Sequence, residues 1–284
     1  MSKLEDDRVF LEHGPIRMLI DVSIEKRRQP ELSFIVGSYV VDEFKRACEQ
    51  MPILKGINPI GQPIERYPIS VRKMLTAVKR VRDDTLTPLA AVAGAFSDIA
   101  LEKALGLGAE RVIINNGGDI AFKDVRGNPI KVGIPVSKDK STSLLSLTLS
   151  DKNIGGICTS GIGGRSFTKG IATVAVAIAE NAALADACAT YLGNETNVED
   201  PEIIRCYAED IDSETDIPGQ LVTLKVGFLS KKKIYSALLN GVNAAENLYK
   251  QHIIWGAVLC INKEIVTIPS GINISSRSVM FPPE

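Results

Sequence analysis

The sequence predicts an α+β protein in which mixed sheets pack against helices. Segments with the pattern of strands and segments with the pattern of helices come in clumps rather than in strict alternation, which favours this class over a doubly wound sheet. Of the 284 residues, 45% are hydrophobic and 24% are charged, as in an ordinary globular protein. This length is enough for a single domain, or two closely packed lobes, whose core needs no disulfide or metal.

The first third of the chain predicts a hairpin, a loop and three helices. Apolar residues on both sides of His13-Gly14-Pro15 predict the hairpin, over residues 8–22. Prolines and glycines predict an irregular loop over residues 52–68, which we expect to join two lobes. Pro88 suits the first turn of a helix, and the small residues at 90–95 predict close packing of that helix against a neighbour. The predicted helices cover residues 31–50, 69–82 and 89–106.

The rest of the chain predicts mainly strands, with three further helices. Gly193 is expected to end the first of these helices in the left-handed conformation that glycine adopts readily. Asn262-Lys263 is expected to form the turn of a hairpin over residues 253–268. The predicted strands cover residues 111–114, 120–122, 130–136, 143–149, 155–159 and 171–179, and the predicted helices cover 182–192, 201–209 and 231–250.

Charge and cysteine usage exclude several classes of partner. The 33 basic and 34 acidic residues give a net charge of −1, so we expect no binding to nucleic acid or to a membrane surface. Five cysteines without a CxxC spacing fit a reducing compartment and argue against a disulfide framework. No apolar stretch is long enough to span a membrane, and the first residues lack the apolar core of a signal peptide. We therefore expect a cytoplasmic protein.

A pair of glycines lies between two apolar strand segments, in the run Asn115-Asn116-Gly117-Gly118-Asp119. Adjacent glycines let the backbone reach positive φ and approach a ligand closely. Successive N–H groups in such a turn can bind an anion such as phosphate. The same residues are those that a two-residue hairpin turn requires. On these residues alone the hairpin turn is the favoured interpretation, and the phosphate site is the alternative.

A carboxylate and a hydroxyl share one face of the helix predicted over residues 182–192. Asp186 and Thr190 are four residues apart, so their side chains point to the same side. Two oxygen ligands in this arrangement, with waters and phosphate oxygens, suit Mg²⁺. The alternative is a surface aspartate and a threonine bonded to its own helix turn. The surrounding alanines argue against a surface position, because an alanine-rich face usually packs against something.

A third group of polar residues forms a glycine-flanked loop. Cys158-Thr159-Ser160-Gly161 is rich in hydrogen-bond donors, and Arg165 adds a guanidinium suited to phosphate. Cys158 is a candidate reactive thiol, although the sequence shows no nearby histidine or cluster of bases that would lower its pKa. A buried, unreactive cysteine is the more frequent case.

The order and spacing of these three motifs resemble the ApbE family. Members of that family contain NIGGDI, then ATSG, then ADALAT or ADALST, and the matching stretches here are Asn116–Ile120, Cys158–Gly161 and Ala185–Thr190. The resemblance covers about residues 85–193, the motif-bearing part of the chain. The short, non-lipoprotein ApbE-like branch is the most similar, because its PxAAVAGA motif matches Pro88–Ala95.

The resemblance implies an ApbE-like fold, a flavin nucleotide and a metal ion. ApbE proteins bind FAD and, with Mg²⁺, transfer its FMN half to a threonine of a client flavoprotein. By this resemblance Asp186 and Thr190 hold the Mg²⁺, which would stabilise charge on the departing AMP. The residues implied to bind FAD or FMN are Asn116, Gly117, Gly118, Asp119, Thr159, Ser160, Gly161 and Arg165.

The chain departs from the family in the residues that would move protons. Family transferases carry a His-Ile-Ile-Asp-Pro segment before the metal-binding helix, and residues 166–170 take its place here. The two histidines, His13 and His252, lie near the ends of the chain. We therefore expect impaired or altered FMN transfer, with Asp119 and Cys158 as the candidate catalytic residues.

Two specific functions remain open on the sequence, beside a more general one, an assembly protein that uses the fold as an interaction surface. The first is Mg²⁺-dependent binding of a flavin or adenine nucleotide, with or without FMN transfer to a client protein. The second is an accessory role in sulfide incorporation toward homocysteine in anaerobes, without flavin transfer, which the resemblance to the ApbE-like branch implies. Cys158 would then be the residue that handles sulfur. A homo-oligomer is compatible with both functions.

Overall fold

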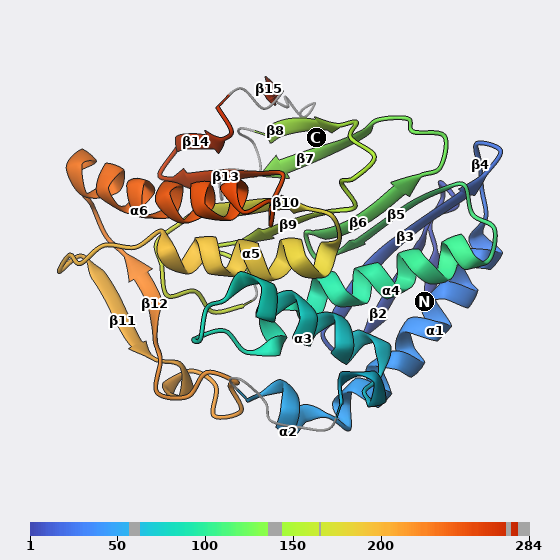
Figure 1. Ribbon diagram of the computed structural model, residues 1–284, viewed down its shortest axis with the longest axis horizontal. Helices are drawn as coiled ribbons and strands as arrows, with labels where there is room; N and C mark the ends of the chain where they lie inside the picture. Colours follow the sequence, from blue (N-terminus) through green and yellow to red (C-terminus); the bar gives the residue numbers. More distant parts are fainter. Residues whose placement is uncertain (57–62, 136–143, 165, 271–273, 278–284) are drawn as a thin grey trace. The chain divides into compact units, whose positions relative to one another are not determined.

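The computed structural model describes residues 1–56, 63–135, 144–164, 166–270 and 274–277 (Figure 1). They form two compact units, each built from several stretches of the chain. The first unit contains residues 1–128, 152–158 and 178–188, and the second contains residues 129–151, 159–177 and 189–284. Three elements contribute residues to both units, namely β9 (Gly156–Ser160), β10 (Val174–Ala179) and α5 (Ala182–Glu195).

An antiparallel sheet is the framework of the first unit. Its strands are β1 (Ser2–Lys3), β2 (Val9–His13), β3 (Ile16–Ile24), β4 (Arg27–Arg28), β5 (Arg111–Asn116) and β6 (Asp119–Asp124). The order is β1-β2-β3-β5-β6-β9, and β4 pairs with β3. Side chains alternate between the two faces of a strand, so Met18, Ile20 and Val22 of β3 are buried together with Val112 and Ile114 of β5.

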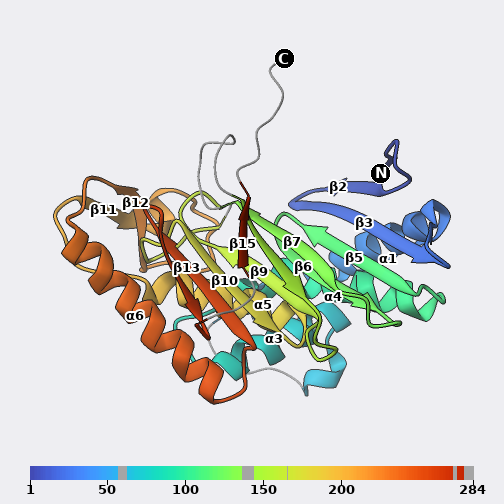
Figure 2. The same ribbon diagram turned by 90° about the horizontal axis from the view of Figure 1, so that it is seen from above.

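Helices cover this sheet in the first unit (Figures 1 and 2). They are α1 (Pro30–Cys48), α2 (Met51–Leu54), α3 (Ile69–Val81) and α4 (Val92–Gly106), with short 3₁₀ turns η1 (Ile64–Arg66) and η2 (Pro88–Ala91). Helices α1 and α4 pack on the strands, and α3 packs on α1 and α4. Because α4 contacts both the sheet and its neighbouring helices, it is the element that positions the candidate site.

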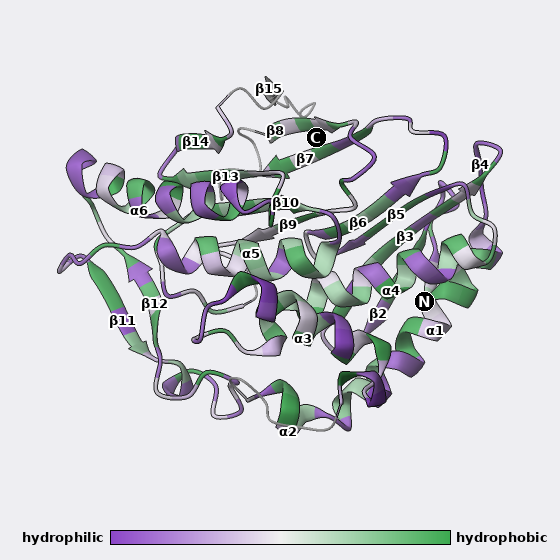
Figure 3. Ribbon diagram, viewed as in Figure 1, coloured by the Kyte–Doolittle hydropathy of each residue, from purple (hydrophilic) through white to green (hydrophobic). Residues whose placement is uncertain are grey.

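The second unit contains several antiparallel strand pairings and one long helix. Its strands are β7 (Ile130–Pro135), β8 (Leu144–Leu149), β11 (Ile203–Tyr207), β12 (Leu221–Val226), β13 (Gly256–Ile261), β14 (Glu264–Ile268) and β15 (Ile274–Arg277). Strand β8 lies between β7 and β15, β11 pairs with β12, and β13 pairs with β14. Helix α6 (Lys231–Lys250) packs on β13 and β14, and hydrophilic and hydrophobic stretches alternate along it (Figure 3).

The α+β class and most predicted elements are confirmed. The hairpin predicted over residues 8–22 is β2–β3, and the one predicted over residues 253–268 is β13–β14. Asn262 and Lys263 form the turn of the second hairpin, with φ angles of 48° and 73°. A helix long and apolar enough to cross a membrane is absent from the part of the chain that the structure describes.

The prediction that Gly193 ends a helix is wrong. Helix α5 continues through Gly193 to Glu195. A Cβ atom on the nearby Gly170 would overlap the Gly193 carbonyl oxygen, so the loop at Gly170 lies directly against the helix backbone. Gly170 therefore allows this close packing, whereas Gly193 lies inside α5 and is not among the residues with positive φ.

The helix predicted over residues 201–209 is also wrong. Residues 203–207 form β11, and a 3₁₀ turn, η3 (Ala208–Asp210), follows. The antiparallel partner β12, which we did not predict, supplies the ladder of hydrogen bonds, and the pairing shifts register between Ile204 and Arg205. Tertiary pairing overrides the local helical pattern here. Of the loop expected to join two lobes, residues 52–56 and 63–68 lie within the first unit, and residues 57–62 lie outside the described residues.

Candidate functional site

Gly117 and Gly118 form the two-residue turn of the β5–β6 hairpin. Asn116 pairs with Asp119 across the turn, and the φ angles of the two glycines are 72° and 113°. A two-residue turn with positive φ at both central positions strongly favours glycine. The Asn115 side-chain oxygen accepts a hydrogen bond from the Gly118 N–H at 2.9 Å. The hairpin-turn interpretation is therefore confirmed, and the Gly118 N–H already has a partner.

The hairpin turn is anchored to the first turns of α4. The Asn116 amide donates to the Ala93 carbonyl at 3.3 Å, and the Ser97 hydroxyl donates to the backbone carbonyl of Asp119 at 2.8 Å. Asn116 is buried, whereas Asp119 is half-buried. Asn116 thus holds the turn in place, and the carboxyl group of Asp119 is the group in this motif that can take part in chemistry.

Two aspartates exchange helix caps between α4 and α5. The Asp186 carboxylate, on α5, accepts a hydrogen bond from the Gly94 N–H at 2.9 Å in the first turn of α4. The Asp98 carboxylate, on α4, accepts from the Ala182 and Ala183 N–H groups, both at 2.9 Å, at the start of α5. The first N–H groups of a helix lack partners within the helix and carry the positive end of its dipole, so a carboxylate there is stabilising. Asp186 therefore has a structural role as well.

Helices α4 and α5 approach closely at Gly94. A Cβ atom on Gly94 would overlap the Ala182 carbonyl group and lie 2.8 Å from the Asp186 Cβ. Any larger residue at this position would push the two helices apart. The close packing predicted from the small residues at 90–95 is thus confirmed, and it brings the α4 backbone within reach of Asp186.

The acidic side chains around this crossing raise one another's proton affinity. Burial is the largest cause that raises the pKa of Asp186, and the charge of Asp119 is the next. The N–H groups of Gly94 and Ala93 act in the opposite direction. Burial likewise raises the pKa of Asp98, to about 6. We call Asp98, Asp119 and Asp186 the acidic cluster. Neighbouring carboxylates resist full ionisation, so the acidic cluster favours a bound proton or a cation.

The acidic cluster is not a complete metal site by itself. Among the residues with described positions, no group of three or more His, Cys, Asp or Glu side chains could hold a metal ion. Mg²⁺, however, usually keeps several waters and takes only one or two carboxylates together with phosphate oxygens. The carboxylates of Asp186 and Asp119 fit that pattern, so their donor chemistry suits Mg²⁺ on a phosphate-bearing ligand.

Cys158 lies near these acids in a setting that keeps its thiol protonated. The residue has no exposed surface, and its Sγ donates a hydrogen bond to the Ala182 carbonyl at 3.2 Å. Burial raises its pKa well above the usual value, and the charges of Asp119 and Asp186 add to the effect. A reactive cysteine needs the opposite, an electropositive and accessible setting. The environment therefore favours the unreactive-cysteine interpretation and works against Cys158 as a catalyst or sulfur carrier.

The other predicted ligand-binding residues belong to the second unit. Thr159 is half-buried and Ser160 is buried at the end of β9, and Thr190 is half-buried on α5. Gly161 has a φ of 134°, and a Cβ atom there would crowd neighbouring backbone carbonyls, so its loop requires glycine. Arg165 lies outside the described residues. Convergence of this group with Asp186 and the hairpin turn stays a prediction.

Sequence reasoning missed Asp98, which helps to hold the site together. Asp98 is 2% exposed and binds the first turn of α5 with both carboxylate oxygens. Its signal in the sequence was a single carboxylate in the run from Phe96 to Leu101, in which Ser97 is the only other polar residue. A lone acid in such a run is almost never buried without partners.

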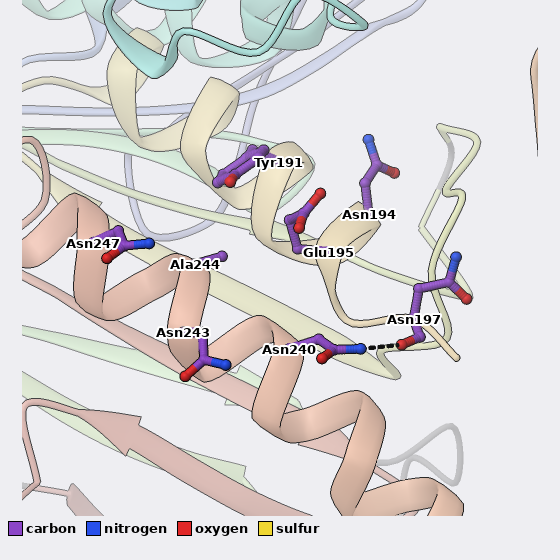
Figure 4. Close-up of a pocket in the computed structure, with 8 residues that line it drawn as sticks. All are labelled: Tyr191, Asn194, Glu195, Asn197, Asn240, Asn243, Ala244 and Asn247. Carbon is purple, nitrogen blue, oxygen red and sulfur yellow. Dashed lines mark hydrogen bonds between the residues drawn. The ribbon is translucent and has the colours of Figure 1, made fainter. Parts of the chain in front are cut away.

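An asparagine-lined cavity in the second unit was also not predicted (Figure 4). It has a volume of about 420 Å³ and lies between the last turns of α5 and the middle of α6. The Asn240 amide donates to the Asn197 carbonyl at 2.9 Å across it. Its asparagines are Asn194, Asn197, Asn240, Asn243 and Asn247. Asn240, Asn243 and Asn247 recur at helical spacing on α6, and this spacing is the feature of the sequence from which a shared polar face could have been predicted.

Comparisons with known proteins agree with the motifs. A family model described as AbpE bacteria matches residues 1–267. A UPF0280 protein of Methanosarcina barkeri is 35% identical over 159 residues, which are 56% of this chain and 60% of that protein. A UPF0280 protein of Methanothermobacter thermautotrophicus is 31% identical over 181 residues, 63% of this chain and 67% of that protein. The chain therefore spans about 60% of the length of the first curated relatives that it matches.

A slight overall likeness to a solved structure is also found. The apo form of the Pseudomonas stutzeri flavinyl transferase ApbE gives a TM-score of 0.46 at 12% identity, over 94% of this chain and 95% of that one. A likeness of this size supports no argument about the site. The family model, by contrast, covers nearly the whole chain. The chain belongs to the AbpE bacteria family, the ApbE-like family that its three motifs resemble.

Proposed function

We propose that this protein binds a flavin nucleotide, FAD or FMN, together with Mg²⁺ at the acidic cluster around Asp186. The observation that carries the proposal is the effect of Asp119 on the half-buried Asp186, since the negative charge of the one raises the pKa of the other. A divalent cation would offset that repulsion and draw a diphosphate to the same place. Family membership supports the choice of a flavin nucleotide.

Each residue has a distinct part in this proposal. Asp186 and Thr190, one turn apart on α5, supply oxygen ligands, and Mg²⁺ when bound stabilises charge on the phosphate groups. The Gly94 N–H orients the Asp186 carboxylate through its hydrogen bond. Asn116 and Ser97 hold the hairpin turn on α4, which keeps Asp119 near Asp186. Preorganisation of this kind lowers the cost of binding a cation.

Replacing Asp186 with asparagine is expected to abolish the Mg²⁺ dependence of FAD binding and to weaken binding at least about tenfold, the factor that 1.4 kcal/mol gives. Asparagine keeps an oxygen that can accept the Gly94 hydrogen bond but loses the negative charge. Titration calorimetry of FAD, in Mg²⁺ and in EDTA, measures both effects.

The matched control is Asp84→Asn, which removes one carboxylate from an exposed position of the same unit. It should bind FAD as the parent does. Binding that is equally tight in Mg²⁺ and EDTA for the parent would count against the proposal. So would an Asp186→Asn variant that binds like the Asp84→Asn control.

FMN transfer to a client threonine is expected to be absent or very slow. A threonine hydroxyl is a poor nucleophile near neutral pH, and a positioned base typically contributes about 10²–10⁴-fold. The family's histidine-bearing segment is missing, and Asp119 is the remaining candidate base. The assay incubates the protein with FAD, Mg²⁺ and a client that carries a flavinylation motif, and measures covalent flavin fluorescence in a denaturing gel. A strong client band would contradict this expectation, and its loss in Asp119→Asn would identify the base.

A further inference from the structure

A second cavity lies in the first unit, among α3, η1 and the start of α5. Its volume is about 410 Å³, within the range of sites for small organic molecules. The α3 residues that line it recur at helical spacing, from Ile69 through Lys73 and Thr76 to Arg80. One continuous face of α3 is therefore turned toward the cavity, which we call the α3 cavity.

The lining of the α3 cavity carries more positive than negative charge. Three lining side chains are cationic, namely Arg72, Lys73 and Arg80, and two are carboxylates, Glu65 and Glu180. Arg80 forms an ion pair with Glu180. Lys73 forms one at 2.6 Å with Glu102, a residue outside the lining that is half exposed. Exposed pairs of this kind contribute little and can yield to a ligand.

Arg72 is the lining cation that the described residues leave unsatisfied. Its Nε is buried without a hydrogen-bond partner. Its guanidinium takes part in no hydrogen bond or ion pair within the described ranges of the chain. A buried donor without an acceptor is costly, and a shift of the Arg72 side chain that brings Nε to a ligand oxygen would remove that cost. The planar guanidinium matches the oxygens of a phosphate or carboxylate in a two-bond arrangement.

The start of α5 cannot hold an anion in place of these side chains. The Ala183 N–H donates to the Asp98 carboxylate and the Leu184 N–H donates to the Asn181 side chain, each at 2.9 Å. The backbone donors nearest the cavity are therefore already used. Apolar side chains complete the lining, with Ile64 and Ile69 on one side and Leu184 on the other. A ligand that fits both kinds of surface has an anionic group and an apolar part.

We propose that the α3 cavity binds a small organic phosphate monoester, separately from the Mg²⁺-dependent site at Asp186. Arg72 and Lys73 hold the phosphate, and Ile64, Ile69 and Leu184 contact the organic part. A phosphate monoester carries close to two negative charges at neutral pH, which suits Arg72 and Lys73, the two lining cations that form no ion pair with a lining carboxylate, better than the single charge of a carboxylate does.

Phenyl phosphate is the probe that carries both features, and its binding to the full-length protein can be followed by calorimetry or by NMR titration. Arg72→Ala is expected to weaken binding at least tenfold. Arg72→Lys should give an intermediate loss, because it keeps the charge but not the two-bond arrangement. Thr76→Glu places a negative charge on an exposed position of the lining, where it should fold normally and abolish binding.

The matched control is Lys79→Ala, which removes one positive charge from an exposed position of α3 outside the lining and should bind as the parent does. Asp186→Asn should also bind phenyl phosphate normally, which separates this site from the proposed flavin site. Inorganic phosphate should bind more weakly than phenyl phosphate, because it lacks the apolar part. The inference is overturned if phenyl phosphate shows no saturable binding, if benzoate binds as tightly, or if Thr76→Glu and Lys79→Ala bind alike.

Discussion

Gly94→Ala is expected to lower the free energy of unfolding by about 3 kcal/mol, at the upper end of the range for overpacked cores. The added methyl group would overlap the Ala182 carbonyl and lie 2.8 Å from the Asp186 Cβ. These atoms belong to the α5 backbone and to the first carbon of a side chain, so no flexible group can move aside. The two helices would have to separate, and the hydrogen bond from the Gly94 N–H to Asp186 would lengthen or break.

Chemical denaturation of the two proteins measures this loss, and Gly106→Ala is the matched control. Gly106 ends the same helix, and a Cβ atom there would meet nothing within 4 Å. The control should be neutral or more stable than the parent by up to about 1 kcal/mol, because alanine favours a helix over glycine. Equal stability of the two variants would show that the close approach of α4 and α5 is absent in solution.

Gly94→Ala is also expected to weaken the Mg²⁺-dependent binding of FAD. Asp186 owes its orientation to the Gly94 N–H, so a wider helix crossing displaces the proposed metal ligand. If FAD binding weakens more than the loss of folded protein explains, the packing of α4 against α5 is linked to the proposed metal site. Binding measured on the folded fraction alone, at a temperature well below the unfolding transition, separates the two effects.

Elements that carry their own local signal were predictable from the sequence. Helix α6 has a serine cap, in which Ser230 accepts from the Lys233 N–H, and apolar residues at helical spacing, and its predicted bounds, 231–250, are those observed. The β13–β14 turn follows from Asn262-Lys263, whose residues adopt positive φ. Strand β11 carries no such signal, because its pairing partner β12 is separated from it by residues 208–220 and supplies the interactions that decide its structure.

The candidate site was predictable as a set of motifs but not as a set of contacts. The Asn116–Asp119 motif and Asp186 could be recognised from their order and spacing along the chain. The exchange of caps between α4 and α5 could not, because the sequence does not reveal that Asp98 meets residues 84 and 85 positions away. That arrangement gives Asp186 a structural partner in Gly94, which neither the metal-ligand interpretation nor the surface interpretation of the sequence included.

Asp98 is expected to make the stability of the protein depend on pH in a direction unusual for a carboxylate. Burial raises its pKa from 3.8 to about 6, although the charge of Lys73 and the N–H groups of Ala183 and Ala182 act against this. The folded protein then holds a proton that the unfolded chain releases between these two values. The contribution of Asp98 to stability is fully present below pH 3.8 and is lost as the pH rises through 6. The size of the loss is about 3 kcal/mol, from 1.36 kcal/mol for each pKa unit.

The measurement compares the unfolding free energies of the parent and Asp98→Asn in EDTA at several pH values. Asparagine does not titrate, and its single oxygen can accept only one of the two hydrogen bonds from the start of α5. The lost bond lowers the unfolding free energy of the variant by about 1–3 kcal/mol at every pH. It therefore changes the difference in unfolding free energy between the two proteins by a constant and does not change how that difference depends on pH. Between pH 4 and pH 6 the unfolding free energy of the parent should therefore fall relative to that of the variant. Asp84→Asn controls for the loss of one negative charge from the same unit. A difference that stays constant or widens with pH would mean that folding does not raise the pKa of Asp98. The two N–H donors at the start of α5 would then outweigh its burial.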